Sequence, residues 1–236
     1  MTARATPETA PPALQIVPLN PPPVFSHVCP HIFRSADPGV LPDAFVFLET
    51  LHLRSIVLLS IEYPSKAMKA FAAKNHVQMH HFGIERRWPT PNLTGTVYAQ
   101  QPMPKTSNLF LSVHEMNSFS VLESIVKDAL QLLLDVRNHP VLVTDTAGIF
   151  ETGTLIGCLR KMQGWNFASI LLEYRGFAGP LSRGANERFI ETFDTDLVTL
   201  PPTEFIPDWL LPPQQFFVDD VERSDASSTT DSVPSV

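Results

Sequence analysis

The amino-acid sequence predicts an α/β fold, a sandwich in which a central, mostly parallel sheet is flanked by helices. Short apolar runs alternate with segments of helical periodicity between about residues 31 and 194. Residues 54–61 form a nearly continuous apolar run, which is typical of a strand covered on both faces. Seven of the ten glycines lie between Gly148 and Gly184, so backbone freedom is concentrated near one strand-to-helix turn.

The expected elements follow one another in βαβα order. Phe45, Leu48 and Leu51 have helical spacing after a Pro and Asp start, which predicts a helix over 42–51. By the same reasoning we expect strands at 31–34, 54–61, 77–82 and 141–144, and further helices at 65–75, 120–136, 151–163, 166–178 and 184–194. The irregular stretch from 85 to 117 is unusual inside a compact domain, so we interpret residues 88–117 as an insertion or a functional loop.

Proline marks the expected ends of the folded part. Of the 23 prolines, seven lie in residues 1–23 and six in 201–236. Proline resists helix and inner strand alike, because it lacks an amide donor. We therefore expect a disordered Pro-rich arm over 1–22, a folded domain over 23–200, and a tail over 201–236 that is first Pro-rich and then acidic and rich in Ser and Thr.

Composition excludes several classes of function. The net charge is −7, residues 212–236 carry −4 of it, and the remainder has no basic stripe, which argues against a nucleic-acid partner. No apolar run approaches the ~20 residues that span a membrane. Cys29 and Cys158 are too few for a disulfide framework, so we expect a cytoplasmic protein. His80 and His81 are adjacent on a strand and point to opposite faces, so we expect no metal site and no cofactor.

The candidate site is the strand-to-helix turn after residue 143. A buried strand that feeds a glycine-containing loop and then a helix places backbone amides around a helix N-terminus, where an anion can bind. The residues of this turn are Thr144, Asp145, Thr146, Ala147, Gly148, Ile149, Phe150, Glu151, Thr152 and Gly153.

Several segments resemble one known family. They are residues 32–35, 51–56, 82–85, 138–143, 152–153 and 157–161. Together they are similar to the plant and fungal atypical dual-specificity (tyrosine) phosphatases, and within them to the fungal oxidant-induced cell-cycle arrest group, over about residues 17–197. In active members the loop reads His-Cys, five residues, Arg-Thr-Gly. The cysteine thiolate attacks phosphorus and the arginine binds the equatorial oxygens.

The resemblance implies a degenerate phosphate loop. Thr144 stands for the histidine, Asp145 for the cysteine and Glu151 for the arginine, while Gly148 and the Thr152-Gly153 pair are kept. Two carboxylates at ~4–6 Å repel by several kcal/mol at an effective dielectric of ~20. We therefore expect no catalytic residue here, and a self-filled loop in which Asp145 and Glu151 accept the amides that a phosphate would otherwise accept.

The function that we expect is that of a pseudophosphatase, a regulatory or scaffolding subunit that forms a hetero-oligomer with related phosphatase-family proteins. The resemblance implies that active relatives hydrolyse inositol pyrophosphates or phosphotyrosine. The alternatives are a residual phosphatase with those substrates, a non-catalytic anion sensor, and an enzyme in which Asp145 itself is the nucleophile. The last needs a magnesium site, and no second aspartate lies at 143–149.

Two features of the irregular stretch belong to this interpretation. Arg86 and Arg87 are a candidate contact for an anionic ligand, because in the resembled family the loop near this position borders the phosphate pocket; the alternative is a solvated charge pair. The insertion is a candidate partner surface, since aromatic side chains dominate interface energetics and it contains Trp88 and Tyr98. Its Trp88-Pro89-Thr90 run has threonine where tyrosine phosphatases carry an acidic residue, and we interpret it as coincidence.

Overall fold

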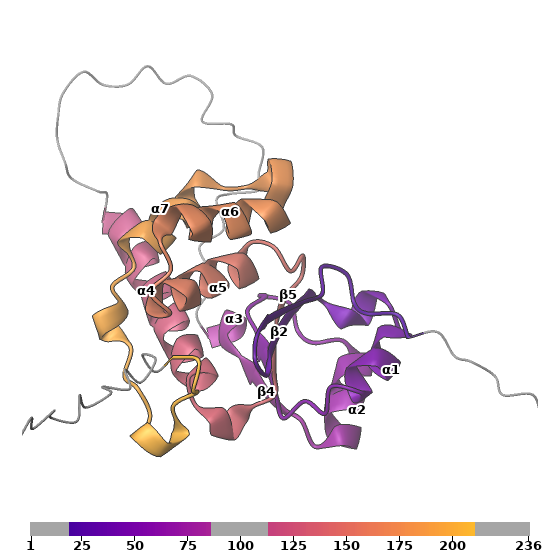
Figure 1. The fold of residues 1–236 in the computed structure, drawn as a ribbon. Coiled ribbons are helices and arrows are strands. Elements are labelled where there is room, and N and C mark those ends of the chain that lie inside the picture. Colours follow the sequence, from indigo (N-terminus) through magenta and orange to yellow (C-terminus); the bar gives the residue numbers. More distant parts are fainter. Residues whose placement is uncertain (1–18, 86–112, 211–236) are drawn as a thin grey trace, which may run out of the picture.

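The structure of the protein is a computed structural model, and it describes residues 19–85 and 113–210 (Figure 1). Its centre is a five-stranded sheet with the order β1-β2-β5-β3-β4. The strands are β1 (Ser26–Cys29), β2 (Ile32–Ala36), β3 (Ser55–Leu58), β4 (Gln78–His81) and β5 (Val141–Asp145). Only β1 is antiparallel to its neighbour, and the other three pairings are parallel. The structure thus confirms a central, mostly parallel sheet flanked by helices.

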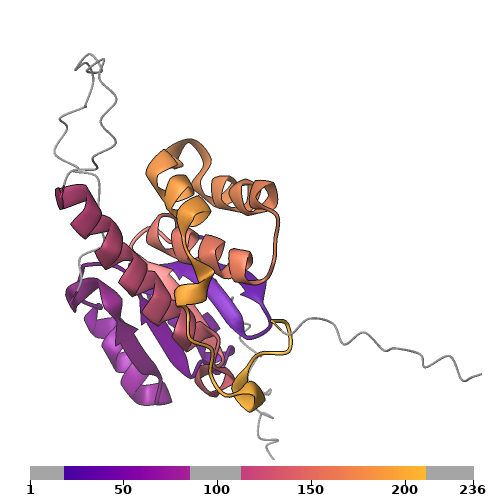
Figure 2. The same ribbon diagram turned by 90° about the vertical axis from the view of Figure 1, so that its left-hand side faces the viewer.

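Helices cover both faces of the sheet. They are α1 (Ala44–Glu49), α2 (Lys66–Asn75), α3 (Phe82–Glu85), α4 (Val113–Leu133), α5 (Glu151–Met162), α6 (Phe167–Ala178) and α7 (Gly184–Thr192), with 3-10 turns at η1 (Pro38–Val40), η2 (Val136–Asn138), η3 (Gly179–Leu181), η4 (Thr195–Leu197) and η5 (Thr203–Phe205). Figures 1 and 2 show α1 and α2 on one side of the sheet and α4 and α5 on the other. Helices α6 and α7 pack on the outer side of α5.

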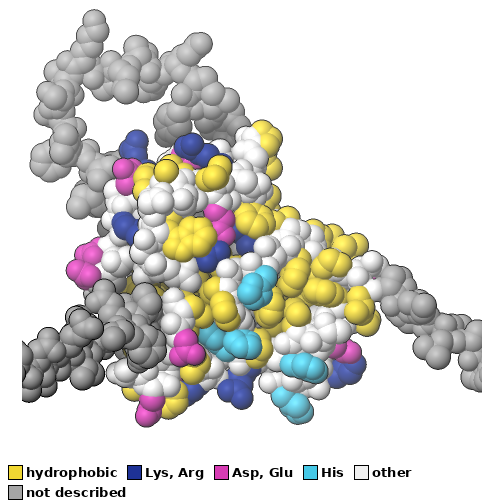
Figure 3. All heavy atoms as spheres, in the orientation of Figure 1, with side chains coloured by type: hydrophobic (Ala, Val, Ile, Leu, Met, Phe, Trp, Pro, Cys, Tyr) yellow, Lys and Arg dark blue, Asp and Glu magenta, His cyan; other side chains and the backbone are white. Residues whose placement is uncertain are grey.

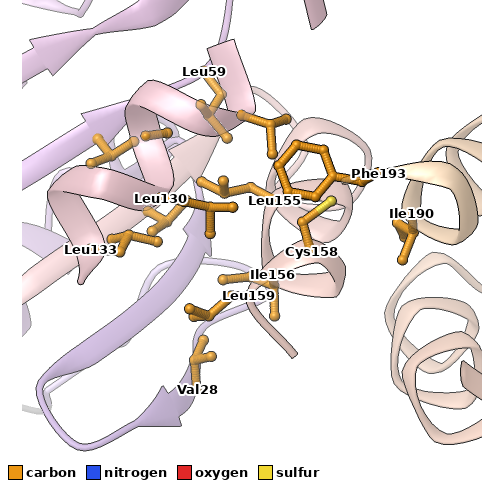
Figure 4. Close-up of a cluster of buried hydrophobic side chains, with 14 of the residues drawn as sticks. Val28, Leu59, Leu130, Leu133, Leu155, Ile156, Cys158, Leu159, Ile190 and Phe193 are labelled. Atoms are coloured by element: carbon orange, nitrogen blue, oxygen red, sulfur yellow. The ribbon is translucent and has the colours of Figure 1, made fainter. Parts of the chain in front are cut away.

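The larger core lies between the sheet and α4–α5 (Figure 4). Leu130 and Leu133 of α4 face Leu155 and Leu159 of α5, and all four are fully buried. Burying such a side chain stabilises the fold by about 1.5–3 kcal/mol. Cys158 lies in the same cluster, and burial raises the pKa of its thiol. The cysteine is therefore a core residue rather than a reactive thiol.

One buried ion pair joins three elements around this core. Arg160 of α5 forms two hydrogen bonds with the carboxylate of Glu173 on α6, each 2.8 Å long, and a third with the carbonyl of Val28 on β1. Its guanidinium carbon also lies 4.2 Å from the ring centre of Trp165. Because these contacts satisfy a charge that is almost fully buried, Arg160 fixes α5 and α6 against the edge of the sheet.

Apart from small shifts at the ends of elements, the structure differs from the sequence-based expectation in three places. Strand β1 was not predicted, because its residues are partly polar and its stability comes from pairing with β2, in which Ser26 lies opposite Arg34. Helices α3 and α4 occupy both ends of the stretch predicted as irregular, so α4 begins at Val113 instead of residue 120. The folded part also continues past residue 200, since Trp209 and Leu210 pack against the larger core. The rest of the predicted arm, insertion and tail lies outside the described residues.

Within the two described ranges, none of the helices has the length and apolar character needed to traverse a lipid bilayer.

Candidate functional site at the carboxyl end of β5

The candidate loop begins where three parallel strands end together. In the register of the sheet, Asp145 at the end of β5 lies opposite Ala36 of β2, and Thr144 lies opposite Leu58 of β3. Residues 146–150 then turn the chain into α5, which begins at Glu151. The carboxyl edge of a parallel sheet is where open α/β folds bind their ligands, so the position agrees with a ligand loop.

Asp145 fills the centre of this turn. Its side chain accepts hydrogen bonds from the backbone amides of Gly148 and Thr152, and the second of these is 2.8 Å long. The residue is only 2% exposed. Amides at a helix N-terminus are the donors that an incoming anion would use. In this structure a carboxylate of the chain itself accepts two of them.

Glu151 lies next to Asp145 at the start of α5. Burial, followed by the charge of Asp145, raises the pKa of the Glu151 carboxyl group to about 8. At neutral pH most of this group therefore holds its proton, which it can donate to the neighbouring carboxylate. The sequence suggested two full negative charges in repulsion. The structure relieves that repulsion, because one of the two acids stays neutral.

Arg34 is a site residue that the sequence analysis did not single out. It comes from β2, is 1% exposed, and its Nη2 donates a 2.7 Å hydrogen bond to the carbonyl of Gly148. Its guanidinium carbon lies 3.8 Å from the ring centre of Phe177. Burial lowers its pKa to about 10, so the group remains a cation at neutral pH and offsets the charge of Asp145. The sequence feature that could have identified it is an arginine that directly follows the apolar pair Ile32-Phe33 in a predicted strand.

The loop needs a glycine at position 148. Gly148 has a φ of +69°, and a Cβ atom there would collide with the backbone of Ser35 and Ala36 on β2. The rest of the turn is tied to its surroundings by side chains. The hydroxyl of Thr146 donates a 2.8 Å hydrogen bond to Glu62, and Asn186 of α7 donates one of 3.3 Å to the carbonyl of Phe150.

A cation also lies at the rim of the loop. The guanidinium carbon of Arg183, just before α7, is 3.5 Å from the ring centre of Phe150. Its charge partly counteracts the upward shift in the pKa of Glu151. Arg183 and Arg34 therefore reach the loop from different elements, Arg183 from the residue before α7 and Arg34 from β2.

The ten predicted residues of the turn, 144–153, are brought together as one continuous loop and helix start. Arg86 and Arg87 lie outside the described residues, as do Trp88 and Tyr98. His80 pairs with Val57 and His81 with Leu58 across β3 and β4, which places their side chains on opposite faces of the sheet as predicted. Over residues 19–85 and 113–210 no three His, Cys, Asp or Glu side chains form a group that could hold a metal ion.

Comparison with known proteins identifies relatives for most of the chain. The sequence profile of the tyrosine phosphatase family matches residues 19–209. The protein named inositol diphosphatase DSP3 from Arabidopsis thaliana is 40% identical over 177 residues, which cover 75% of this chain and 72% of that protein. The putative tyrosine-protein phosphatase OCA1 from Scheffersomyces stipitis is 35% identical over 204 residues, which cover 85% and 86%.

The fold has a counterpart among solved structures. The core catalytic domain of the PP-IP phosphatase SIW14 from S. cerevisiae, crystallised in complex with citrate, superposes with a TM-score of 0.57 at 29% sequence identity. The match covers 76% of this chain and 90% of that domain. With the profile match and the level of identity, these similarities show that this chain belongs to the tyrosine phosphatase family, alongside plant inositol diphosphatases and fungal OCA1 proteins.

Proposed function

We propose that this protein is a catalytically inactive member of its family, a pseudophosphatase that acts as a regulatory or scaffolding subunit for active relatives. The position that carries the nucleophilic cysteine in the family motif is Asp145, and the position of the phosphate-binding arginine is Glu151. A carboxylate is a weaker nucleophile than a thiolate, and a neutral glutamic acid offers no bidentate grip on a phosphate.

The observation that most supports this proposal is the pair of hydrogen bonds that Asp145 accepts from the amides of Gly148 and Thr152. A phosphate that entered the loop would have to displace a buried carboxylate from these donors. It would also approach that carboxylate within a few ångströms, which costs several kcal/mol at a protein-like dielectric. The loop is therefore stable without a bound anion and unfavourable for one.

The first test is turnover. Full-length protein incubated with para-nitrophenyl phosphate or with an inositol pyrophosphate should release no more phosphate than a heat-denatured sample, while Arabidopsis DSP3 under the same conditions serves as the positive control. Saturable release by the wild type, lost in Asp145→Asn, would overturn the proposal. That result would instead favour a residual phosphatase in which Asp145 takes part in the reaction.

The second test is anion binding. Calorimetric titration of sulfate or an inositol polyphosphate should give no measurable heat of binding with the wild type. Glu151→Arg should restore weak binding, because it supplies a bidentate donor above the retained Gly148 turn. Adding Asp145→Cys should recover hydrolysis that is still ~10²–10⁴-fold below an intact enzyme, since the sequence from Arg86 to Asn117 contains no aspartate that could serve as general acid. Tight binding by the wild type would favour an anion sensor.

The regulatory role is tested by association. Affinity purification of the native protein should recover catalytically active family members, and a purified pair should change the rate at which the active member hydrolyses its substrate. Recovery of the protein as an isolated monomer, with no effect on such an enzyme, would leave the proposed scaffolding role without support and contradict it.

A further inference from the structure

A second site lies at the opposite end of the sheet from the loop. It is a pocket of about 610 Å³ between the β1–β2 turn, η2 and the C-terminal segment that follows η5. His31 and His139 line the pocket. His31 directly precedes β2, and His139 lies two residues before β5, so both are at the amino ends of these strands, whereas the loop follows their carboxyl ends. Strands β2 and β5 are each five residues long, so the two sites lie roughly 15 Å apart. The pocket is therefore distinct from the phosphatase loop.

Apolar side chains make up one part of the lining. Val136, Ile206 and Trp209 contribute it, and Trp209 is held in place because it also packs against the larger core. Pro30 and Pro207 also line the pocket, and its polar side chains are those of His31, His139 and two carboxylates. Figure 3 shows this face of the molecule, where histidine and acidic side chains lie close to one another below the centre.

The two carboxylates of the pocket, Glu204 and Asp208, are exposed and have no hydrogen bond or salt bridge to another residue in the described ranges. No Lys or Arg lines the pocket. The nearby cation Arg137 is already engaged, because Asp135 binds its guanidinium through both carboxylate oxygens and its Cζ lies 4.1 Å from the ring centre of Phe205. Glu204 acts on Arg137 only through its charge, which helps to raise the pKa of that guanidinium, so both carboxylates can still form a hydrogen-bonded ion pair with a ligand.

His139 adds no positive charge to this site. Its Nε2 lies 2.8 Å from the carbonyl oxygen of Leu133, which can only accept, so Nε2 carries the hydrogen. Burial lowers the pKa of the imidazole below its ordinary value, which keeps the ring neutral at pH 7. In the neutral ring Nδ1 carries no hydrogen, so it is a hydrogen-bond acceptor like the two carboxylates. Three of the four polar groups of the lining therefore favour a ligand that donates hydrogen bonds and carries positive charge.

We propose that this pocket binds an ammonium or guanidinium group at the end of a short apolar stem. The stem would lie against Val136 and Ile206, and the cationic head would pair with Glu204 and Asp208. The indole of Trp209 adds a cation–π surface, which contributes about 0.5–1 kcal/mol at an exposed site. Residues 212–236 carry a net charge of −4, so charge complementarity disfavours the chain's own tail as the occupant.

The test uses fluorescence of Trp209 in the full-length chain, with Trp88→Phe and Trp165→Phe to remove the other two tryptophans. n-Butylammonium and n-butylguanidinium should change the emission in a saturable way, whereas n-butanol and butyrate should not. Glu204→Gln and Asp208→Asn should each weaken binding about two- to fivefold, as expected for partly exposed ion pairs. Asp196→Asn, an exposed carboxylate outside the pocket, is the matched control and should leave binding unchanged.

The same titration distinguishes two sources of the cation. Saturable binding of a short peptide with one lysine, lost when that lysine is acetylated, indicates a basic side chain of a partner protein, and binding of the free amine alone indicates a small metabolite amine. Either result supports the pocket. Equal responses to butylammonium and butanol, or unchanged affinity in the Glu204→Gln, Asp208→Asn double variant, would overturn the proposal. Circular dichroism spectra that match the wild type show that the variants are folded.

Discussion

Removal of the Asp145 carboxylate is the most direct test of how the loop is held together. In Asp145→Ala the amides of Gly148 and Thr152 lose their acceptor in a nearly buried site. An unsatisfied buried donor costs ~1–3 kcal/mol, so the two together cost ~2–6 kcal/mol. We therefore expect a loss of ~2–6 kcal/mol in the free energy of unfolding.

The assay is urea unfolding of the full-length chain at neutral pH, followed by far-ultraviolet circular dichroism. Asp43→Ala is the matched control, because Asp43 is exposed and its side chain makes no capping hydrogen bond to α1. A surface substitution of this kind changes stability by no more than ~0.5 kcal/mol. If Asp145→Ala is as stable as this control, Asp145 is not the acceptor that stabilises the loop, and the argument for a self-filled site fails.

Three further changes test neighbouring contacts. The pKa of Glu151 in the folded state, about 8, lies above its ordinary value of 4.5. The free energy of unfolding should therefore fall as the pH rises from 4.5 to about 8, and Glu151→Gln should flatten that part of a stability–pH curve. Gly148→Ala should destabilise by several kcal/mol through collision with β2, whereas Gly164→Ala, also at positive φ but with open space around it, should cost only ~1 kcal/mol in the same unfolding assay. Arg160→Met should cost ~3–5 kcal/mol because it leaves the Glu173 carboxylate without its partner, and adding Glu173→Leu should recover part of the loss; a double variant no better than the single one would contradict this.

Local sequence patterns predicted the elements that build the loop. The apolar run before Asp145 and the glycines after it lie close together along the chain, so their order alone predicts a strand, a turn and a helix. Strand β1 could not be predicted in this way. It is short and partly polar, and it forms because β2 offers it a partner. The start of α4 at Val113 was also missed, because a helix already nucleated extends through residues with weak periodicity.

The electrostatics of the loop depend on pairings that sequence order does not contain. The spacing of Asp145 and Glu151 indicated two neighbouring carboxylates. The balancing cation, Arg34, is brought into contact with the loop only by the parallel register between β2 and β5, in which Arg34 lies opposite Val143. The protonated state of Glu151 also follows from burial, which is a property of the packed structure. Charge counting along the chain therefore overestimated the repulsion within the loop.

The two ends of the sheet differ in which groups still lack a partner, and this difference gives opposite expectations for added ions. At the carboxyl end, amides of the loop already bond to Asp145, so sulfate should leave the melting temperature unchanged. At the amino end, Glu204 and Asp208 have no hydrogen-bond or salt-bridge partner within the described residues, so n-butylammonium at about ten times its dissociation constant should stabilise the fold by ~1.4 kcal/mol. For a domain of this size that corresponds to a rise of about 3–5 °C in melting temperature, measured against tetramethylammonium at equal ionic strength. A rise with sulfate would contradict the self-filled loop, and equal effects of the two ammonium salts would contradict the pocket.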